Sequence, residues 1–232
     1  MATYLLVHGT WHGGWCWKKL TPLLRAAGHE VYTPTLTGLG ERAHLLSPAV
    51  GADTHVQDVL GVLEFEDLRQ VILVGHSYAG LLLPVILERA ADRIQQLVYF
   101  DATVAASGQS LFERYPQTRA QVAESVRTQG DGWRVPPPDY NFGVTDEADL
   151  KWLRSHLVPQ PLRACEQPVV YAREPRTFVP CTYIACIGDN PPGGARFPEG
   201  EGMRYVELAA GHDGMIGAPA ALAEILLSLP DD

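Results

Sequence analysis

Short runs of apolar residues recur along the chain, and most of them are continuous rather than alternating with polar residues. They cover residues 3–8, 29–34, 70–75, 96–101, 181–188 and 204–208. Continuous apolar runs of this length are typical of strands that are covered on both faces, as in a parallel sheet. The pattern therefore predicts that these six segments form one mostly parallel sheet.

Helical patterns of apolar residues separate these runs. They predict helices over residues 15–27, about 53–66, 79–91 and 217–229. Strands that alternate with helices form right-handed crossovers and a doubly wound α/β sheet. We therefore expect the α/β class, with helices on both faces of the sheet.

The alternation is interrupted once, between about residues 104 and 179. This stretch contains the proline-rich segments VPPPDY, VPQP and REPRTFVP, and it shows helical patterns around 111–128 and 146–157 but no convincing strand. Long connections in compact domains are usually functional lids or linkers. We expect a single domain over residues 1–232, with residues 104–179 inserted into it as a cap.

Composition and charge narrow the range of partners. A chain of 232 residues with 46% hydrophobic residues suits one domain with a sizeable core. Its 18 Lys and Arg against 27 Asp and Glu give a net charge of −9, which disfavours nucleic acid and anionic membrane surfaces as partners. The N-terminal sequence MATYLLVHG lacks the features of a secretory signal, and no apolar stretch approaches the roughly 18 residues of a membrane span. We expect a cytoplasmic protein, and its oligomeric state is not indicated.

The cysteines indicate neither disulfides nor a zinc site. Cys16, Cys165, Cys181 and Cys186 form no CxxC pair and no Cys/His spacing of a structural zinc site. Cys181 and Cys186 stand an odd number of residues apart on one predicted strand, so they should point to opposite faces. We expect four reduced thiols.

The segment VGHSYAG, residues 74–80, indicates a catalytic serine. Ser77 directly follows an apolar run and precedes a helical pattern, which places it at a sharp strand-to-helix turn. Such a turn exposes the hydroxyl above the carboxyl edge of the sheet and requires small neighbours, here Gly75, Ala79 and Gly80. Ala79 stands where the nucleophile-elbow motif has glycine, and an ordinary turn with a capping serine is the alternative.

A nucleophilic serine needs a base and an acid that orients it. His212, in AAGHDGM, follows the last predicted strand, and Asp189, in CIGDN, follows the strand before it. The order Ser77, Asp189, His212 is that of α/β-hydrolases. Taken singly, His212 would also fit a loop and Asp189 a turn. Asp101 ends the run LVYFD at the same edge of the sheet and is a second candidate for the acid, or a structural residue that accepts backbone N–H bonds.

The glycine-rich segment HGTWHGGW, residues 8–15, follows the first predicted strand and suits an oxyanion hole. We assign its donors to the backbone N–H groups of Thr10 and Tyr78. His8 and His12 would suit a metal pair on a helix, but the intervening glycine favours a loop and no third ligand is in phase. We therefore expect no metal and no cofactor.

Several segments resemble a known group of proteins. LLVHGTWHGGWCW, LLRAAGHEV, GHSYAG, YIACIGDN and GHDGM are similar to the α/β-hydrolases that include plant methylesterases, plant hydroxynitrile lyases and bacterial carboxylesterases. LTGLGERAHLLS and THVQDVL resemble the bacterial branch in particular. The resemblance runs nearly from end to end and is weakest in the predicted cap. It implies the α/β-hydrolase fold and serine esterase chemistry, with the same triad and oxyanion donors as above.

Three other activities remain open at this point. The resembling plant lyases carry threonine and lysine where this chain has Gly9 and Asp213, and an acidic residue there would disfavour a cyanide anion. Some members of the fold are small-molecule receptors with little turnover. The segment GLGERA, residues 38–43, matches a nucleotide-binding pattern, but no clear helix follows it, so we interpret it as a loop.

The substrate is the least determined feature. Trp11, Trp133, Phe142 and Trp152 lie in the oxyanion loop or the predicted cap, where a pocket wall should be apolar, although plain packing explains each of them equally well. We expect a small or medium-sized, apolar or aromatic carboxylic ester as the substrate. The bacterial hydrolases that the chain resembles also cleave carbamates.

Overall fold

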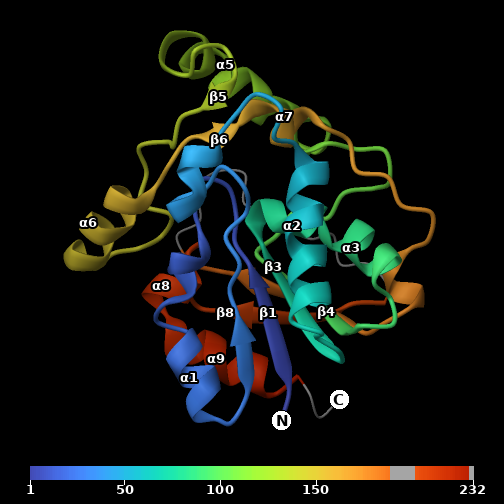
Figure 1. Cartoon of the computed structure of the whole chain (residues 1–232). Helices are drawn as coiled ribbons and strands as arrows, with labels where there is room; N and C mark the ends of the chain where they lie inside the picture. The colour runs from blue at the N-terminus through green and yellow to red at the C-terminus, as the bar shows by residue number, and fades with distance from the viewer. Residues whose placement is uncertain (189–201, 230–232) are drawn as a thin grey trace.

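The computed structural model describes residues 1–188 and 202–229, and a six-stranded sheet forms its centre (Figure 1). Every neighbouring pair of strands is parallel. The predicted α/β fold is confirmed, and each of the six predicted strands is present. In spatial order the strands are β2 (Glu30–Tyr32), β1 (Thr3–Val7), β3 (Val71–His76), β4 (Ile94–Phe100), β7 (Cys181–Cys186) and β8 (Arg204–Leu208).

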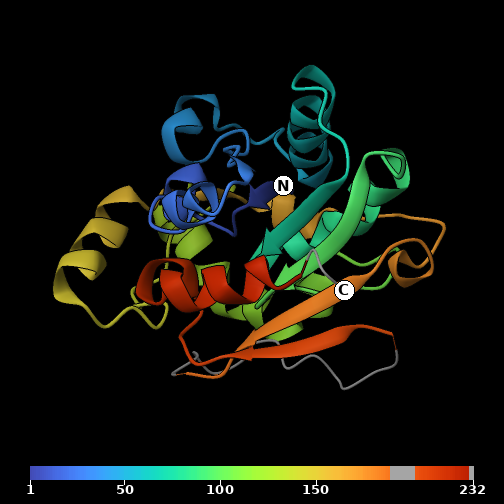
Figure 2. The ribbon, with the colours of Figure 1, turned by 90° about the horizontal axis from the view of Figure 1, so that it is seen from below.

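Side chains of the central strands alternate between two buried cores, one on each face of the sheet. Leu5 and Leu73 point into one core, and Tyr4 and Val74 into the other. Figures 1 and 2 show α1 and α9 together on one side of the sheet and α2 and α3 on the other. Burial on both faces explains why the strands read as continuous apolar runs. The covering helices are α1 (Thr21–Ala26), α8 (Gly214–Gly217) and α9 (Pro219–Leu227) on one face, and α2 (Ala52–Phe65) and α3 (Leu83–Arg89) on the other.

The predicted helices over 15–27 and 79–91 are each divided into two shorter elements, and the short helix α8 lies ahead of the predicted helix over 217–229. The 3₁₀ helix Gly14–Trp17 precedes α1, Ser77–Leu81 precedes α3, and α8 precedes α9. Pro22, Pro84 and Pro219 each stand in the first turn of the longer helix. Proline has no N–H to donate, so it is tolerated there and interrupts a helix elsewhere.

The carboxyl ends of β1 and β3 lie side by side at the point where the winding of the sheet reverses. From β1 the chain passes to β2 on one side, and it then returns to β3 on the other side of β1. Open α/β sheets bind their ligands at such a switch point. The loop after β1 and the turn after β3 therefore meet where the fold favours a site.

Among the residues that the structure describes, the segment between β4 and β7 adds no strand to the six-stranded sheet. In Figure 1, α5, β5 and β6 lie at the end of the molecule towards which β1 runs. The predicted helical patterns are found, and β5 and β6 form a separate antiparallel pair that the sequence did not indicate. Two-residue strands are too short to produce a pattern of apolar residues. The elements are α4 (Leu111–Arg114), α5 (Pro116–Gln129), β5 (Arg134–Val135), α6 (Glu147–His156), β6 (Gln160–Pro161), α7 (Leu162–Glu166) and the 3₁₀ helix Pro175–Thr177.

The four cysteines are free and buried. In the part of the chain that the structure describes, no helix is both long enough and apolar enough to cross a membrane. The nucleotide-like segment around residues 38–43 runs into a short 3₁₀ helix, Gly40–Leu45, rather than into the long helix that a nucleotide-binding motif requires.

Candidate active site

Ser77 occupies a strained turn between β3 and a 3₁₀ helix. β3 ends at His76, the helix Ser77–Leu81 begins at the next residue, and Ser77 has a φ of 53°. This left-handed conformation is costly for a residue with a side chain, by about 1–3 kcal/mol, and it is typical of functional turns. Ser77 is partly exposed, whereas the residues on either side of it are buried. The predicted sharp strand-to-helix turn is present.

Two glycines allow other backbone segments to approach this turn. A Cβ atom on Gly9 would lie 2.8 Å from the Cβ of Ser77 and 3.1 Å from Nδ1 of His76. A Cβ atom on Gly80 would lie 2.5 Å from the carbonyl oxygen of Thr103, whose N–H donates to the Ser77 carbonyl at 2.9 Å. The loop after β1 and the segment after β4 are therefore both packed against the serine.

His212 lies in the loop after β8, and its ring is held by Asp101. Nδ1 of His212 is 2.6 Å from Oδ2 of Asp101, and the Asp101 side chain is only 3% exposed. The other carboxylate oxygen, Oδ1, accepts the N–H of Cys186 at 3.2 Å. Asp101 directly follows β4, in a left-handed conformation with a φ of 42°. One carboxylate thus orients the histidine and also accepts a backbone N–H from β7, which combines both roles that the sequence left open for it.

Asp189, the acid that we favoured from the sequence, lies outside the described residues. The structure therefore does not test that assignment. Among the described residues, the carboxylate on His212 Nδ1 is that of Asp101, the second candidate.

The surroundings of His212 act on its pKa in opposite directions. Burial disfavours the imidazolium and lowers the pKa. The hydrogen bond and the charge of Asp101, together with the charge of Asp213, outweigh burial, and the pKa of His212 is raised above its usual value. The site therefore favours a histidine that accepts a proton, as a general base does.

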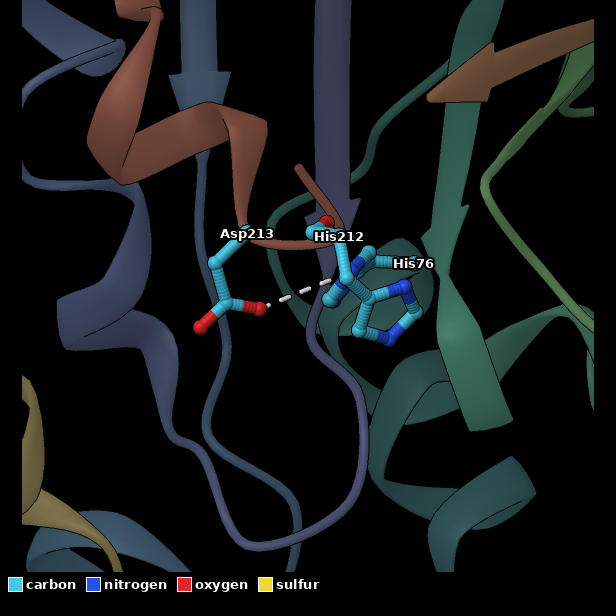
Figure 3. A group of neighbouring side chains, drawn as sticks. All are labelled: His76, His212 and Asp213. Carbon is cyan, nitrogen blue, oxygen red and sulfur yellow. Dashed lines mark hydrogen bonds and ion pairs between the residues drawn. The ribbon is translucent and has the colours of Figure 1, made fainter. Parts of the chain in front are cut away.

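Two neighbours fix the backbone around His212. The N–H of Asp213 donates to the Phe142 carbonyl at 2.9 Å, and the rings of Phe142 and His212 stack with centroids 6.5 Å apart. The His76 ring lies 4.5 Å from the His212 ring, and its Nε2–H donates to the His212 carbonyl at 3.0 Å. Figure 3 shows His76 and Asp213 pointing toward one another beside His212. Since His76 immediately precedes Ser77, these contacts join the serine turn to the histidine loop.

The proposed oxyanion donors lie in well-anchored backbone. Tyr78 is the second residue of a 3₁₀ helix, so its N–H has no partner within that helix. Its hydroxyl donates to Nδ1 of His55 at 3.0 Å, while His55 Nε2–H donates to the Thr37 carbonyl. Burial lowers the pKa of His55 to about 4, which keeps this ring neutral. The Thr10 carbonyl faces Nδ1 of His12 at 2.6 Å.

The four aromatic residues singled out from the sequence have different surroundings. Trp11 joins the oxyanion loop to the β4–β7 segment, because its indole N–H donates to the Val135 carbonyl at 3.0 Å. Phe142 stacks beside His212, as described. Trp152 packs edge-to-face on Trp15, with centroids 5.1 Å apart, and the Trp133 ring is covered by the Arg134 guanidinium. Phe142 thus lies beside His212, with the Trp11 ring 6.1 Å from the Phe142 ring, whereas the contacts described for the other two are with residues of the surrounding structure.

One group of side chains has the composition of a metal site. His76, His212 and Asp213 offer ligand atoms that all lie within 4.8 Å of one another. One nitrogen of each histidine is engaged, His76 Nε2 by the His212 carbonyl and His212 Nδ1 by Asp101. We assign no metal to the group. His8, which the sequence also raised, uses both of its nitrogens in hydrogen bonds to backbone groups.

Comparison with known proteins places these features in context. A model of the alpha/beta hydrolase family matches residues 4–225. A carbendazim hydrolyzing esterase of Nocardioides sp. (strain SG-4G) is 39% identical over 99% of this chain and 100% of its own length. Methyl jasmonate esterase 1 of Vitis vinifera is 28% identical, over 81% of this chain and 78% of that protein.

Solved structures agree in fold. An extracellular alpha/beta-hydrolase from a Paenibacillus species superposes with a TM-score of 0.84 at 22% identity, over 98% of both chains. The methylesterase MES16 from Arabidopsis superposes with a TM-score of 0.74 at 24% identity, over 100% of this chain and 99% of that one. At these sequence identities, the structural similarity shows a common fold and says nothing about activity.

Proposed function

Because the chain belongs to the alpha/beta hydrolase family and is a hydrolase of its esterase type, we propose that it cleaves small or medium-sized carboxylic esters with apolar or aromatic groups through an acyl-enzyme on Ser77. The observation that carries the proposal is the convergence of three features at one edge of the sheet. They are the strained, partly exposed Ser77, the His212 loop against His76, and the Asp101 carboxylate on His212 Nδ1.

The roles follow from the hydrogen bonds. Asp101 occupies Nδ1 of His212, so Nδ1 carries the proton and Nε2 remains to act as the base. Nε2 accepts the Ser77 hydroxyl proton as Oγ attacks the ester carbonyl carbon. The N–H groups of Thr10 and Tyr78 stabilise the resulting oxyanion. His212 then gives the proton to the departing alcohol, and the acyl group stays on Ser77.

Water completes the cycle by the same proton transfers. It loses a proton to His212 Nε2 as its oxygen attacks the acyl carbon, and the carboxylic acid departs when the proton returns to Ser77. Asp101 stabilises the imidazolium in both halves, which fits the raised pKa of His212. We assign the acid to Asp101 on the strength of the 2.6 Å contact, and Asp189 remains the alternative that the chain order favours.

The β4–β7 segment is proposed to cap this site, with Trp11 and Phe142 in contact with the substrate. The Trp11 indole N–H donates to the Val135 carbonyl of this segment, and the Trp11 backbone N–H donates to Oε1 of Gln160 at 3.4 Å. Phe142 belongs to the same segment and stacks on the base. An apolar wall beside the reacting atoms favours apolar or aromatic acyl and alcohol groups.

Cyanohydrin cleavage and ligand binding without turnover are the competing functions. The carboxylate of Asp213, which replaces the lyase lysine, faces His12 and His76 in the interior and offers no cation to cyanide. A receptor would not require the His212 and Asp101 pair.

The experiment is a panel of esters, lactones, amides, carbendazim and mandelonitrile, assayed with the purified protein and with Ser77→Ala. We expect ester turnover that Ser77→Ala lowers by about 10⁴–10⁶ while the fold is kept. Retained turnover in a folded Ser77→Ala protein would refute the mechanism. Tight binding of a small ligand with no turnover of any acyl compound would favour the receptor function.

A further inference from the structure

Two of the buried histidines in or beside the oxyanion loop, His8 and His55, have the hydrogen bonds of a neutral ring. His8 Nε2 accepts the Leu36 N–H at 3.0 Å, and its Nδ1–H donates to the Gly9 carbonyl at 2.8 Å. His55 likewise accepts at one nitrogen and donates at the other. One donor and one acceptor satisfy a neutral imidazole without an additional proton.

His12 is different, because both of its nitrogens face oxygen acceptors. Nδ1 lies 2.6 Å from the Thr10 carbonyl oxygen, and Nε2 lies 2.9 Å from Oδ2 of Asp213. A carbonyl cannot donate, so the ring proton must be on Nδ1. The contact between Nε2 and Oδ2 then needs a second proton. His12 and Asp213 together therefore hold one proton more than a neutral imidazole and a carboxylate would.

The burial of both side chains supports one additional proton on the pair. The side chains of His12 and Asp213 are 2% and 0% exposed. An isolated carboxylate at such a position would be very costly, whereas a carboxylate paired with an imidazolium is neutral as a unit. The second carboxylate oxygen, Oδ1, is buried without a hydrogen-bond partner and lies 3.9 Å from His76 Nε2 (Figure 3).

We propose that His12 and Asp213 form a protonated, charge-neutral pair that positions the oxyanion loop relative to the catalytic histidine. The inference rests on the proposed function, since it takes Thr10 as an oxyanion donor and His212 as the base. His12 holds the carbonyl of Thr10, and Asp213 is the residue directly after His212. Both are positioning residues, since they act through the backbone of their neighbours.

The backbone on both sides of the pair is arranged for this role. Trp11, between Thr10 and His12, has a φ of 65°, so the chain turns back there and the His12 ring reaches the Thr10 carbonyl. The Asp213 N–H is fixed by the Phe142 carbonyl at 2.9 Å. The donors of an oxyanion hole act by being held in place before charge develops on the oxyanion. A displaced Thr10 N–H should therefore weaken transition-state stabilisation more than substrate binding.

The protonation state is tested directly by NMR of the protein labelled with ¹⁵N in its histidine rings. We expect both ring nitrogens of His12 to carry protons at neutral pH in the wild type and in Ser77→Ala, with the signals assigned by their loss in His12→Gln. In Asp213→Asn the amide should donate to Nε2, leaving His12 neutral with one protonated nitrogen. A wild-type His12 with an unprotonated nitrogen would overturn the proposal, and this readout does not depend on whether the protein hydrolyses esters.

The positioning role is tested by kinetics. Asp213→Ala removes the partner of His12, and kcat for a preferred ester should fall about 100-fold with little change in KM, the scale of a displaced oxyanion donor. A trifluoromethyl ketone, which forms a tetrahedral adduct with the serine, should lose affinity by a similar factor. Asp213→Asn keeps the hydrogen bond and should recover most of both losses.

The control for these variants is Thr182→Val. Thr182 is also buried, at 1% exposed, and its hydroxyl accepts a hydrogen bond from the Gln96 amide at 3.2 Å, near the start of β7 and away from the oxyanion loop. It should lower the melting temperature without changing kcat. An Asp213→Ala protein that is destabilised like this control but has an unchanged kcat would overturn the positioning role.

Discussion

Replacement of Asp101 by asparagine should abolish most of the ester turnover while leaving the local structure in place. The amide oxygen of asparagine can still accept the Cys186 N–H that Oδ1 now accepts at 3.2 Å. Its NH₂ group would then face His212 Nδ1, where Oδ2 now lies at 2.6 Å. An NH₂ donor there forces the ring proton from Nδ1 to Nε2, and a histidine with Nε2–H cannot take the proton of Ser77.

The expected loss is about 10⁴ in kcat, or about 5 kcal/mol of transition-state stabilisation. The remaining activity should also respond differently to pH. A general base works only when it is neutral, so activity rises as the pH rises through the pKa of His212. Asp101 raises that pKa, and its loss should move the acidic limb of kcat/KM to lower pH. Steady-state rates for one ester across the pH range measure both effects.

Asp189→Asn is the comparison variant, because it removes the same charge from the position that the chain order favours. With Asp101 as the acid, it should keep kcat within about tenfold of the wild type and leave the acidic limb in place. Circular dichroism checks that both variants are folded. A loss of about 10⁴ in kcat in Asp189→Asn, with a loss of stability alone in Asp101→Asn, would assign the acid to Asp189 instead.

Three further results are expected. Gly9→Ala should lower kcat by about 100-fold, because its Cβ would lie 2.8 Å from the Cβ of Ser77 and displace the nucleophile; unchanged kcat in the folded variant would contradict the close packing there. Phe142→Ala should impair aryl esters more than acetates, and Trp133→Ala should affect both alike; the opposite selectivity would place Trp133 at the substrate. Cyanide release from mandelonitrile, corrected for spontaneous breakdown, should be negligible, and rates equal to those for esters would contradict the assignment to ester hydrolysis.

Most of the fold could be predicted from the sequence because the signals that specify it are local. A strand buried on both faces shows as a run of apolar residues, and β3 and β4 are such strands. The turn at Ser77 is equally recognisable in the sequence, since it joins an apolar run directly to a helical pattern. The exact ends of the helices were less well predicted, because prolines such as Pro84 divide a pattern that is otherwise continuous.

The partners within the site could not be read from the sequence, because they depend on contacts between distant segments. Asp101 and Asp189 both follow predicted strands at the carboxyl edge, and no local pattern indicates which of them meets His212. His12 and Asp213 are 201 residues apart in the sequence. The sequence suggested His12 as a candidate metal ligand and Asp213 as the replacement of a lyase lysine, and neither observation indicates that they pair. Their pairing follows only from the folded positions of the loops after β1 and β8.

Covalent labelling tests whether Ser77 is a nucleophile activated by His212. The protein is treated with an alkyl phosphonate directed at activated serines, and intact mass and peptide mapping locate the adduct. We expect one adduct per chain, on Ser77, absent from Ser77→Ala and strongly slowed in Asp101→Asn. Labelling of another residue, or no labelling of a folded protein that hydrolyses esters, would contradict the assignment of Ser77 as the nucleophile.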